Sequence, residues 1–594
     1  MFLRRHVLLA YYASATLAVA GVNAAVGVGQ EDPDFDWEST KPSSHLEYHA
    51  CYGEFKCARL EVPLNWLNQS DPRKATIAMI KLPALVPDHD PTFGGPILVN
   101  PGGPGGSGVD FLLTRGHRLR QAADKPGRRH YEIVSFDPRG VSRTTPRSDC
   151  FPKDFLARSG FLLEARGSGA PTNGDNAISY NLAMMEILSQ RCERSGDAMN
   201  YVGTPSVARD MIEMIDKIDE LQKHEASHVS SEEGPLSESE SRLELRKRAT
   251  ASQVPRLRYI GFSYGTVLGN YFASMFPGRV GRMVLDGVCN ADDFATGPGW
   301  LTNTVDADKI FDTFLQGCAD AGPKICALAR ETDESGSDIK ARFNSFLAGL
   351  YKKPIPFLSN TGETVIITGD DITTMIGTVL YKPITGFKHL ASLLDGLMSG
   401  RPEETAQALI GSRAWPLLRK ACPINNDTSP HEPEVLETQN AVICSDGDDI
   451  TDKDLSWWRK YVSQQQEISS ILGALWSTIR LPCSAWRFRA NWQFKGPFTS
   501  PEADPALVPD HPAAPILFLS NRLDPVTPLR AARAMAERHP GAKVVVQEAM
   551  GHCTFGSATS SCIDKVMADY FESGAPPRGS CLVKSNVALG MKDV

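Results

Sequence analysis

The residues best suited to chemistry surround Ser263, in the stretch Tyr-Ile-Gly-Phe-Ser-Tyr-Gly-Thr that spans 259–266. Gly261 and Gly265 flank the serine, β-forming residues precede it, and a helical pattern over 267–276 follows it. A strand that turns directly into a helix holds its central residue in a strained conformation and exposes the side chain, and flanking glycines let neighbouring backbone approach. Ordinary glycine-rich turns carry the same short pattern, but the strand and helix around it favour a nucleophilic serine.

A serine hydroxyl needs a general base to attack a carbonyl carbon, and the base needs a carboxylate to orient it. Two predicted buried strands, over 514–520 and 542–549, lead into Asp524 and His552. Functional residues of open α/β sheets gather just past the carboxyl ends of strands. An aspartate before proline usually forms a turn and a single histidine is usually structural. In the order Ser, Asp, His, however, they predict a triad with Ser263 as nucleophile, Asp524 as orienting acid and His552 as base.

A glycine-rich stretch, Asn-Pro-Gly-Gly-Pro-Gly-Gly-Ser-Gly at 100–108, follows a third predicted strand at 95–99. Such a loop frees backbone N–H groups to point into a site, as an oxyanion hole requires. We assign these donors to Gly103, with Gly102 beside it, and to Tyr264, the residue after the nucleophile. A phosphate-binding loop is the alternative, but the Gly-Lys-Ser/Thr that would complete it is absent.

The chain as a whole has the composition of an exported globular enzyme. Its 594 residues suffice for one large core with an insertion or for two domains, and its net charge of −8 argues against a nucleic-acid surface. Residues 1–24 combine two early arginines, an apolar alanine-rich run and small residues at the end, as in a cleaved secretory signal. A membrane anchor is the rival interpretation, but the apolar run is shorter than the roughly 20 residues of a span. We therefore expect a secreted protein without stable membrane insertion.

Thirteen cysteines in an exported chain predict a disulfide framework with one thiol left over. Sequence alone does not determine the connectivity, and the unpaired residue is expected to be Cys289. The expected pairs are Cys51 with Cys57, Cys318 with Cys326, Cys150 with Cys192, and Cys444 with Cys483. Asn68 and Asn426 begin glycosylation sequons, which matter only in a host that glycosylates.

Further motifs occur in order along the chain. They are Phe-Asp-Pro-Arg-Gly at 136–140, Thr-Pro-Ser-Val-Ala-Arg-Asp-Met at 204–211, Phe-Pro at 276–277, Arg-Met-Val-Leu-Asp-Gly-Val at 282–288, Leu-Asp-Pro-Val-Thr-Pro at 523–528 and Gly-His-Cys at 551–553. With the two glycine-rich motifs, the chain resembles the secreted tripeptidyl-aminopeptidase-like family of α/β hydrolases, relatives of prolyl iminopeptidase. The resemblance covers nearly all of the mature chain and implies the same triad. Asn100 stands where the prolyl iminopeptidase branch usually has histidine, which points to the tripeptidyl branch.

The resemblance implies a mostly parallel central sheet flanked by helices, with a large helical lid inserted before the acid-bearing strand. We expect the core in two parts, 25–290 and 506–594, and the lid at 291–505. Apolar residues recur with helical spacing at 310–315, 339–350 and 390–397. Seven of the nine tryptophans fall in the lid and either form its core or line an apolar pocket: Trp300, Trp415, Trp457, Trp458, Trp476, Trp486 and Trp492.

A helix is predicted over 204–218, where Thr204 and a following proline mark its start. The next segment, 223–255, is rich in Ser, Glu, Arg and Lys and has few large apolar residues. We expect a solvated, disordered surface loop there, which the family lacks. A partner-binding arm is the functional alternative.

The first functional hypothesis is a secreted serine aminopeptidase that releases short peptides from free amino termini through an acyl-enzyme on Ser263. Such an enzyme must neutralise an ammonium group, and the lid offers Asp446, Glu403 and Glu404, although a solvated loop or a helix start explains them equally well. No metal and no organic cofactor is needed for this chemistry. The sequence does not predict the oligomeric state.

Two alternatives use the same fold. The triad would also act on an ester, lactone or amide of a small metabolite. A non-catalytic binding protein with 223–255 as its recognition arm is the third hypothesis, but such proteins typically lose a triad member and all three are present here. Epoxide hydrolysis would need an aspartate in the position of Ser263.

Overall fold

The computed structural model describes residues 35–152, 154–232, 254–360, 362–412, 435–577 and 579–582. The predicted signal at 1–24, Trp415, Cys422 and the Asn426 sequon lie outside these ranges. Within them, no helix combines the length and apolar character needed to cross a membrane.

The centre of the molecule is a ten-stranded sheet in the order β1-β2-β3-β5-β4-β6-β7-β10-β11-β12. The strands are β1 (His49–Cys51), β2 (Phe55–Pro63), β3 (Lys74–Leu82), β4 (Phe93–Asn100), β5 (His130–Phe136), β6 (Leu257–Phe262), β7 (Val280–Asp286), β10 (Leu517–Leu523), β11 (Lys543–Met550) and β12 (Ser580–Leu582). From β5 to β12 all neighbours are parallel, whereas β1, β2 and β3 pair antiparallel at one edge. The strands predicted at 95–99, directly before Ser263, at 514–520 and at 542–549 are present as β4, β6, β10 and β11.

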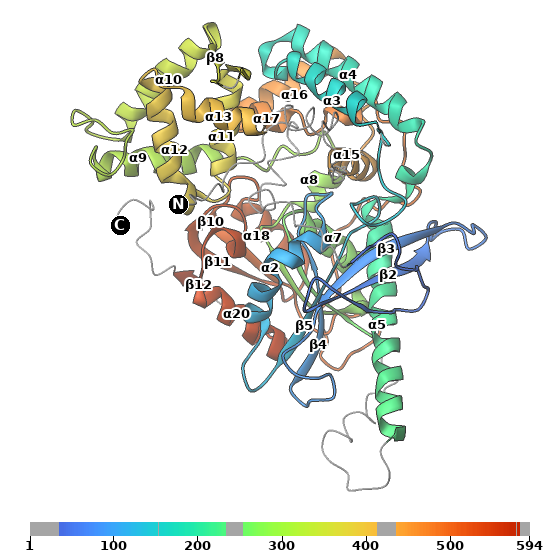
Figure 1. Cartoon of the computed structure of the whole chain (residues 1–594). Helices are drawn as coiled ribbons and strands as arrows, with labels where there is room; N and C mark the ends of the chain where they lie inside the picture. The colour runs from blue at the N-terminus through green and yellow to red at the C-terminus, as the bar shows by residue number, and fades with distance from the viewer. Residues whose placement is uncertain are drawn as a thin grey trace.

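Helices cover both faces of this sheet (Figure 1). One face packs against α2 (Gly108–Ala123) and α20 (Ser561–Ser573), and the other packs against α5 (Thr204–Glu232), α7 (Tyr264–Met275) and α18 (Leu529–Arg538). The central strands are buried on both sides and are therefore almost continuously apolar. This is the α/β-hydrolase fold that the sequence predicts.

A helical cap lies over one end of the core (Figure 1). Most of it lies between β7 and β10: α8 (Ala291–Ala295), α9 (Ala307–Ala321), α10 (Gly336–Lys352), the β8–β9 hairpin (Ile355–Leu358, Thr364–Ile367), α11 (Gly369–Val379), α12 (Pro383–Met398), α13 (Glu403–Ser412), α15 (Val435–Asp446), α16 (Leu455–Ile468), α17 (Gly473–Ser477) and the 3₁₀ turn η4 (Leu481–Ser484). The three helical patterns read from the sequence correspond to α9, α10 and α12.

A second segment joins the cap from the first half of the chain, which the sequence did not indicate. It comprises α3 (Phe155–Gly167), η1 (Pro171–Asn173), α4 (Asp175–Glu193) and η2 (Ala198–Tyr201). Helix α4 packs against α16 and η4. Arg487, which follows η4, forms an ion pair with Glu186 of α4 at 2.6 Å. The remaining short elements are η3 (Pro277–Arg279) and α19 (Thr554–Ser557).

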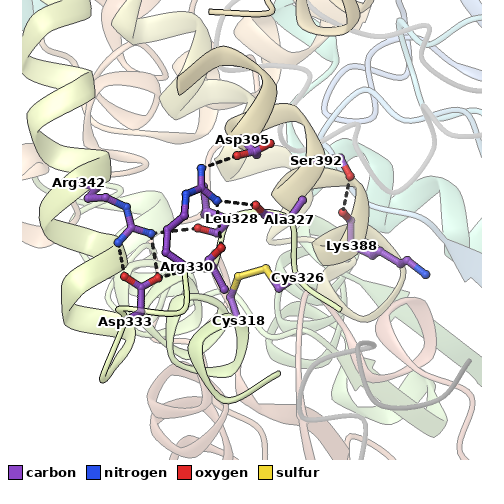
Figure 2. The surroundings of a disulfide bond; sticks show 11 residues. Cys318, Cys326, Ala327, Leu328, Arg330, Asp333, Arg342, Lys388, Ser392 and Asp395 are labelled. Atoms are coloured by element: carbon purple, nitrogen blue, oxygen red, sulfur yellow. Dashed lines mark hydrogen bonds and ion pairs between the residues drawn. A yellow bond between two sulfur atoms is a disulfide. The ribbon is translucent and has the colours of Figure 1, made fainter. Parts of the chain in front are cut away.

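Disulfides join neighbouring elements in both layers. All four predicted pairs form, and Cys562–Cys581 is a fifth that was not foreseen. Figure 2 shows the Cys318–Cys326 bridge at the end of α9, beside Arg330, which reaches Asp395 of α12 at 2.7 Å. The bridge and the ion pair therefore connect α9 to α12 inside the cap.

The count of free thiols differs from the expectation. Cys289 is free, as predicted, but Cys553 is free and buried as well. The expectation of a single leftover thiol is therefore wrong for the described residues. Cys553 Sγ does not face another sulfur atom but lies against the Asp286 carbonyl oxygen and Nε2 of His552, the predicted base.

Helix α5 is longer than the sequence indicates. It runs from Thr204 to Glu232, so the loop expected from residue 223 is helical at least to 232, and 233–253 lie outside the described residues. The extension is stabilised by Leu221 and Ala226, which pack on the core, and by an Asp219–Lys223 ion pair at 2.8 Å. Because only a few apolar residues make these contacts, the sequence of the extension shows no clear helical repeat of apolar residues, and its helix was not predicted.

Candidate active site

Ser263 lies at the junction of β6 and α7. Its backbone has φ 54° and ψ −123°, a conformation that residues other than glycine seldom adopt. A Cβ at Gly261 would lie 2.3 Å from the Gly265 carbonyl oxygen, and one at Gly265 would lie 2.7 Å from the Asn100 carbonyl oxygen. Only glycine fits both positions, so the two flanking glycines permit the close approach that the sequence predicts.

His552 and Asp524 follow the neighbouring parallel strands β11 and β10. His552 Nδ1 lies 3.1 Å from both carboxylate oxygens of Asp524. The same carboxylate accepts backbone N–H bonds from Val526, Thr527 and Cys553 at 2.8–3.0 Å, and both side chains of the pair are fully buried. Because a carboxylate only accepts, Nδ1 carries the ring proton and Nε2 is left with its lone pair.

The loop that bears His552 meets the Ser263 turn through Asp286, the last residue of β7. The Ser263 N–H donates to the Asp286 carbonyl oxygen at 3.1 Å. Cys553 Sγ lies 3.5 Å from that oxygen and 3.6 Å from His552 Nε2. No direct hydrogen bond joins Ser263 Oγ to His552 Nε2 in the described chain. The structure thus brings the predicted nucleophile, base and acid to one edge of the sheet through shared neighbours.

The Asp286 side chain anchors the same loop. Its carboxylate accepts N–H bonds from Thr554 at 2.7 Å and from Phe555 at 3.0 Å. Burial raises the pKa of Asp286 to about 6, although these hydrogen bonds oppose the rise. Asp286 was not among the predicted site residues, although it lies in the Arg-Met-Val-Leu-Asp-Gly-Val motif at 282–288.

The two predicted sources of oxyanion donors also meet. A Cβ at Gly102 would lie 2.4 Å from the carbonyl oxygen before Ser263 and 3.0 Å from Tyr264 N, so the glycine-rich loop touches the turn. The Gly102 N–H is occupied, since it donates to Asn100 Oδ1 at 3.0 Å. Among the described residues, the Gly103 N–H has no protein acceptor, and Tyr264 begins a helix, where the N–H has no intrahelical acceptor. Gly103 and Tyr264 are therefore the two available amides.

Two further residues contact His552 without having been predicted. Thr527 Oγ1 lies 3.0 Å from His552 Nδ1. Tyr381, in the cap after α11, packs its ring edge-on against the imidazole with centroids 5.0 Å apart, and its carbonyl oxygen accepts the His552 N–H at 3.0 Å. Thr527 could have been found from the sequence, because it lies in the Leu-Asp-Pro-Val-Thr-Pro motif, three residues after Asp524. The sequence around Tyr381 gives no sign of its role, because His552, which it contacts, is far away in the sequence.

The three carboxylates considered for substrate binding have different positions. Asp446 is buried at the end of α15, where its oxygens accept the Thr204 N–H at 3.0 and 3.2 Å, and Thr204 Oγ1 lies 2.5 Å from Tyr264 Oη. Glu403 and Glu404 are exposed on α13, which packs on α12 and β9. The structure therefore links Asp446, but neither glutamate, to Tyr264 of the Ser263 turn through Thr204.

The cap tryptophans are mostly buried. Trp458, Trp476 and Trp486 are at most 1% exposed and belong to the main hydrophobic cluster. Trp300 packs on Phe294, which packs on Tyr264, with centroid separations of 5.8 and 5.7 Å. These contacts favour the interpretation that the tryptophans form the cap core and join it to the turn after Ser263.

The chain is similar to several known hydrolases. A sequence model of the family described as TAP-like protein matches residues 469–581, which include Asp524 and His552. A tripeptidyl aminopeptidase of Streptomyces lividans is 22% identical over 565 residues, covering 94% of this chain and 87% of the relative. Serine protease Hip1 of Mycobacterium tuberculosis is 24% identical over 538 residues, covering 88% and 86%. Carboxylesterase B of the same organism is 26% identical over 581 residues, covering 94% and 93%.

All three relatives carry hydrolase names, and each similarity spans most of both chains. The mostly parallel sheet with helices on both faces is the architecture of the α/β-hydrolase fold. The matched segment at 469–581 resembles the TAP-like family, and the relatives together with the fold indicate a hydrolase with the α/β-hydrolase fold.

Proposed function

We propose that the protein is a serine hydrolase in which Ser263 is the nucleophile, His552 the general base and Asp524 the carboxylate that orients the base. The observation that carries this proposal is the contact of His552 Nδ1 with both Asp524 oxygens at 3.1 Å. With Nδ1 protonated, Nε2 takes the proton of the Ser263 hydroxyl as its oxygen bonds to the substrate carbonyl carbon. Asp524 then stabilises the imidazolium that forms.

The negative charge that develops on the substrate oxygen is received by the Gly103 and Tyr264 N–H groups. Each such donor is worth roughly a hundredfold to a thousandfold in rate. His552 returns its proton to the leaving amine or alkoxide, and water then cleaves the acyl-enzyme by the same route. This chemistry fits both amides and esters.

We propose peptides with a free amino terminus as the substrate class, so that the enzyme is an aminopeptidase releasing short peptides. The support is the similarity to a tripeptidyl aminopeptidase and to a serine protease along most of the chain. An extracellular location accords with five disulfides and with the predicted signal at 1–24.

An esterase that acts on a small metabolite is the second candidate. It is favoured by the relative named carboxylesterase B, whose 26% identity is the highest of the three. The two candidates share the proposed triad and differ in whether the pocket neutralises a substrate ammonium.

The test is the rate of the purified protein on three matched chromogenic substrates: a tripeptide amide with a free amino terminus, its N-acetylated twin and a short-chain ester. Strong preference for the free amine supports the aminopeptidase, and cleavage of the ester alone supports the esterase. Ser263→Ala should lower kcat on the order of 10⁶-fold and abolish labelling by a fluorophosphonate. Ser274→Ala, a control on the same helix, should change neither. Turnover retained by Ser263→Ala would refute the assignment of the nucleophile.

A further inference from the structure

A continuous series of hydrogen bonds runs from the cap to the residue after the proposed nucleophile. Asp446 ends α15 of the cap, Thr204 begins α5 of the core, and Tyr264 follows Ser263 directly. Asp446 accepts the N–H of Thr204 at 3.0 and 3.2 Å and also its hydroxyl. Tyr264 Oη lies 2.5 Å from Thr204 Oγ1. The three residues are 2%, 0% and 4% exposed, so water does not compete for these bonds.

The chemistry of the groups sets the direction of every bond in the series. In its ionised form the Asp446 carboxylate only accepts, so Thr204 then donates both its N–H and its O–H to Asp446. The Thr204 oxygen then accepts from the Tyr264 phenol. Bonds aligned in this way polarise and strengthen one another. The Tyr264 ring is also packed against Phe294, so the side chain is held at both its tip and its face.

The Asp446 carboxylate is unusual because, among the described residues, it is buried with no cation on its oxygens. Lys495, the cation whose charge acts on it, donates instead to the Asp446 carbonyl oxygen, at 2.5 Å. Tyr264 and Tyr271 are the other titratable groups that face it. Burial raises the pKa of Asp446 to about 7, and the Thr204 bonds and Lys495 oppose the rise. An unpaired buried carboxylate destabilises a fold, and such groups gather at functional sites.

We infer that Asp446 is a positioning residue that fixes the Tyr264 N–H through Thr204, so that the oxyanion hole is fully formed only when the cap is seated on the core. The inference rests on the proposed function, because it assigns a job to the Tyr264 amide. Asp446 acts on the reaction through Thr204 and Tyr264, and both of its oxygens are already engaged by Thr204. If Asp446 instead bound the substrate ammonium group, its replacement would slow the reaction only of substrates that carry a free amino terminus.

This difference defines the experiment. The variants Asp446→Asn, Thr204→Val and Tyr264→Phe are assayed on the free tripeptide amide, on its N-acetylated twin and on the short-chain ester. Each should lower kcat about tenfold to a hundredfold on every substrate that the wild type cleaves, with KM changed less than threefold. Thr204→Ser, which keeps the hydroxyl, should restore kcat. Asp449→Asn is the matched control, since Asp449 lies in the same segment but is half exposed and pairs with Arg489.

The outcomes separate the possibilities. If Asp446→Asn raises KM for the free amine alone and leaves kcat on the ester unchanged, Asp446 binds substrate and the inference is overturned. If Asp446→Asn does not fold, Thr204→Val and Tyr264→Phe decide, because they cut the series without altering the charge; wild-type kcat in both overturns the inference. An inactive wild type that no fluorophosphonate labels would refute the proposed function, and this inference with it. Active wild type with unaffected variants would refute the inference alone.

Discussion

The contact between the glycine-rich loop and the Ser263 turn leads to a sharp prediction for Gly102→Ala. Gly102 has φ +97°, and a Cβ there would lie 2.4 Å from the carbonyl oxygen before Ser263, 2.9 Å from Ser263 Cβ and 3.0 Å from Tyr264 N. Contacts below 3.0 Å do not occur for real Cβ atoms, and two of these three atoms belong to the backbone. The loop must therefore move away from the turn by about 0.6 Å or more.

The expected size of the effect follows from the geometry. An oxyanion donor acts at about 2.7–3.1 Å, so a shift of this size removes the adjacent Gly103 N–H from useful range. Loss of one such donor costs about 2.7–4 kcal/mol of transition-state stabilisation, a fall of 10²–10³ in kcat. The positive φ adds a folding cost of about 1–2 kcal/mol, because a left-handed conformation is strained in alanine.

Gly127→Ala is the matched control. Gly127 has φ +73° in the turn between α2 and β5, and nothing lies within 4 Å of its Cβ position. It should lose a similar amount of unfolding free energy in a denaturant titration and keep wild-type kcat. Both variants are assayed on the best substrate and titrated with a fluorophosphonate. If folded Gly102→Ala stays within fivefold of the wild-type kcat, the assignment of this loop to the oxyanion hole is wrong.

Two further predictions concern buried hydrogen bonds. Thr527→Val removes the hydroxyl 3.0 Å from His552 Nδ1 and should lower kcat about three- to tenfold with little change in KM; unchanged kcat would show that Asp524 alone orients the ring. Burial lowers the pKa of His539 to about 4, against about 6.5 in the unfolded chain, so its stabilising contribution is present above pH 6.5 and is lost as the pH falls towards 4. Between pH 7 and pH 5 the wild type should therefore lose about 2 kcal/mol more unfolding free energy than His539→Gln; equal losses in urea titrations would contradict this.

The sequence predicted the parts of the site that depend on local patterns. A buried strand reveals itself by a run of apolar residues, and the turn at Ser263 by two glycines whose Cβ atoms would collide with backbone. The contact between Asp524 and His552 could be anticipated because each residue follows such a strand, and parallel strands end at one edge of the sheet. The four expected disulfides formed for a similar reason, since their partners are at most 42 residues apart.

Other features depended on contacts between distant segments. Helix α5 exceeded its prediction because a few small contacts with the core stabilise its extension. Helices α3 and α4 joined the cap through packing against α16, which no periodicity in either segment reveals. Cys553 stayed free because its sulfur lies against Asp286 and His552.

By itself, therefore, the sequence determined the central strands, the turn at Ser263 and the order of the predicted triad, because strand patterns and glycine sterics act between near neighbours. Only the tertiary structure decided which of the candidate carboxylates is connected to that turn by hydrogen bonds. Asp446 reaches Thr204 across 242 positions, and Thr204 reaches Tyr264 across 60. Glu403 and Glu404 carry the same charge but stand exposed on α13. The sequence shows that all three side chains are carboxylates, but which of them is buried and close to the turn depends on how the cap packs on the core.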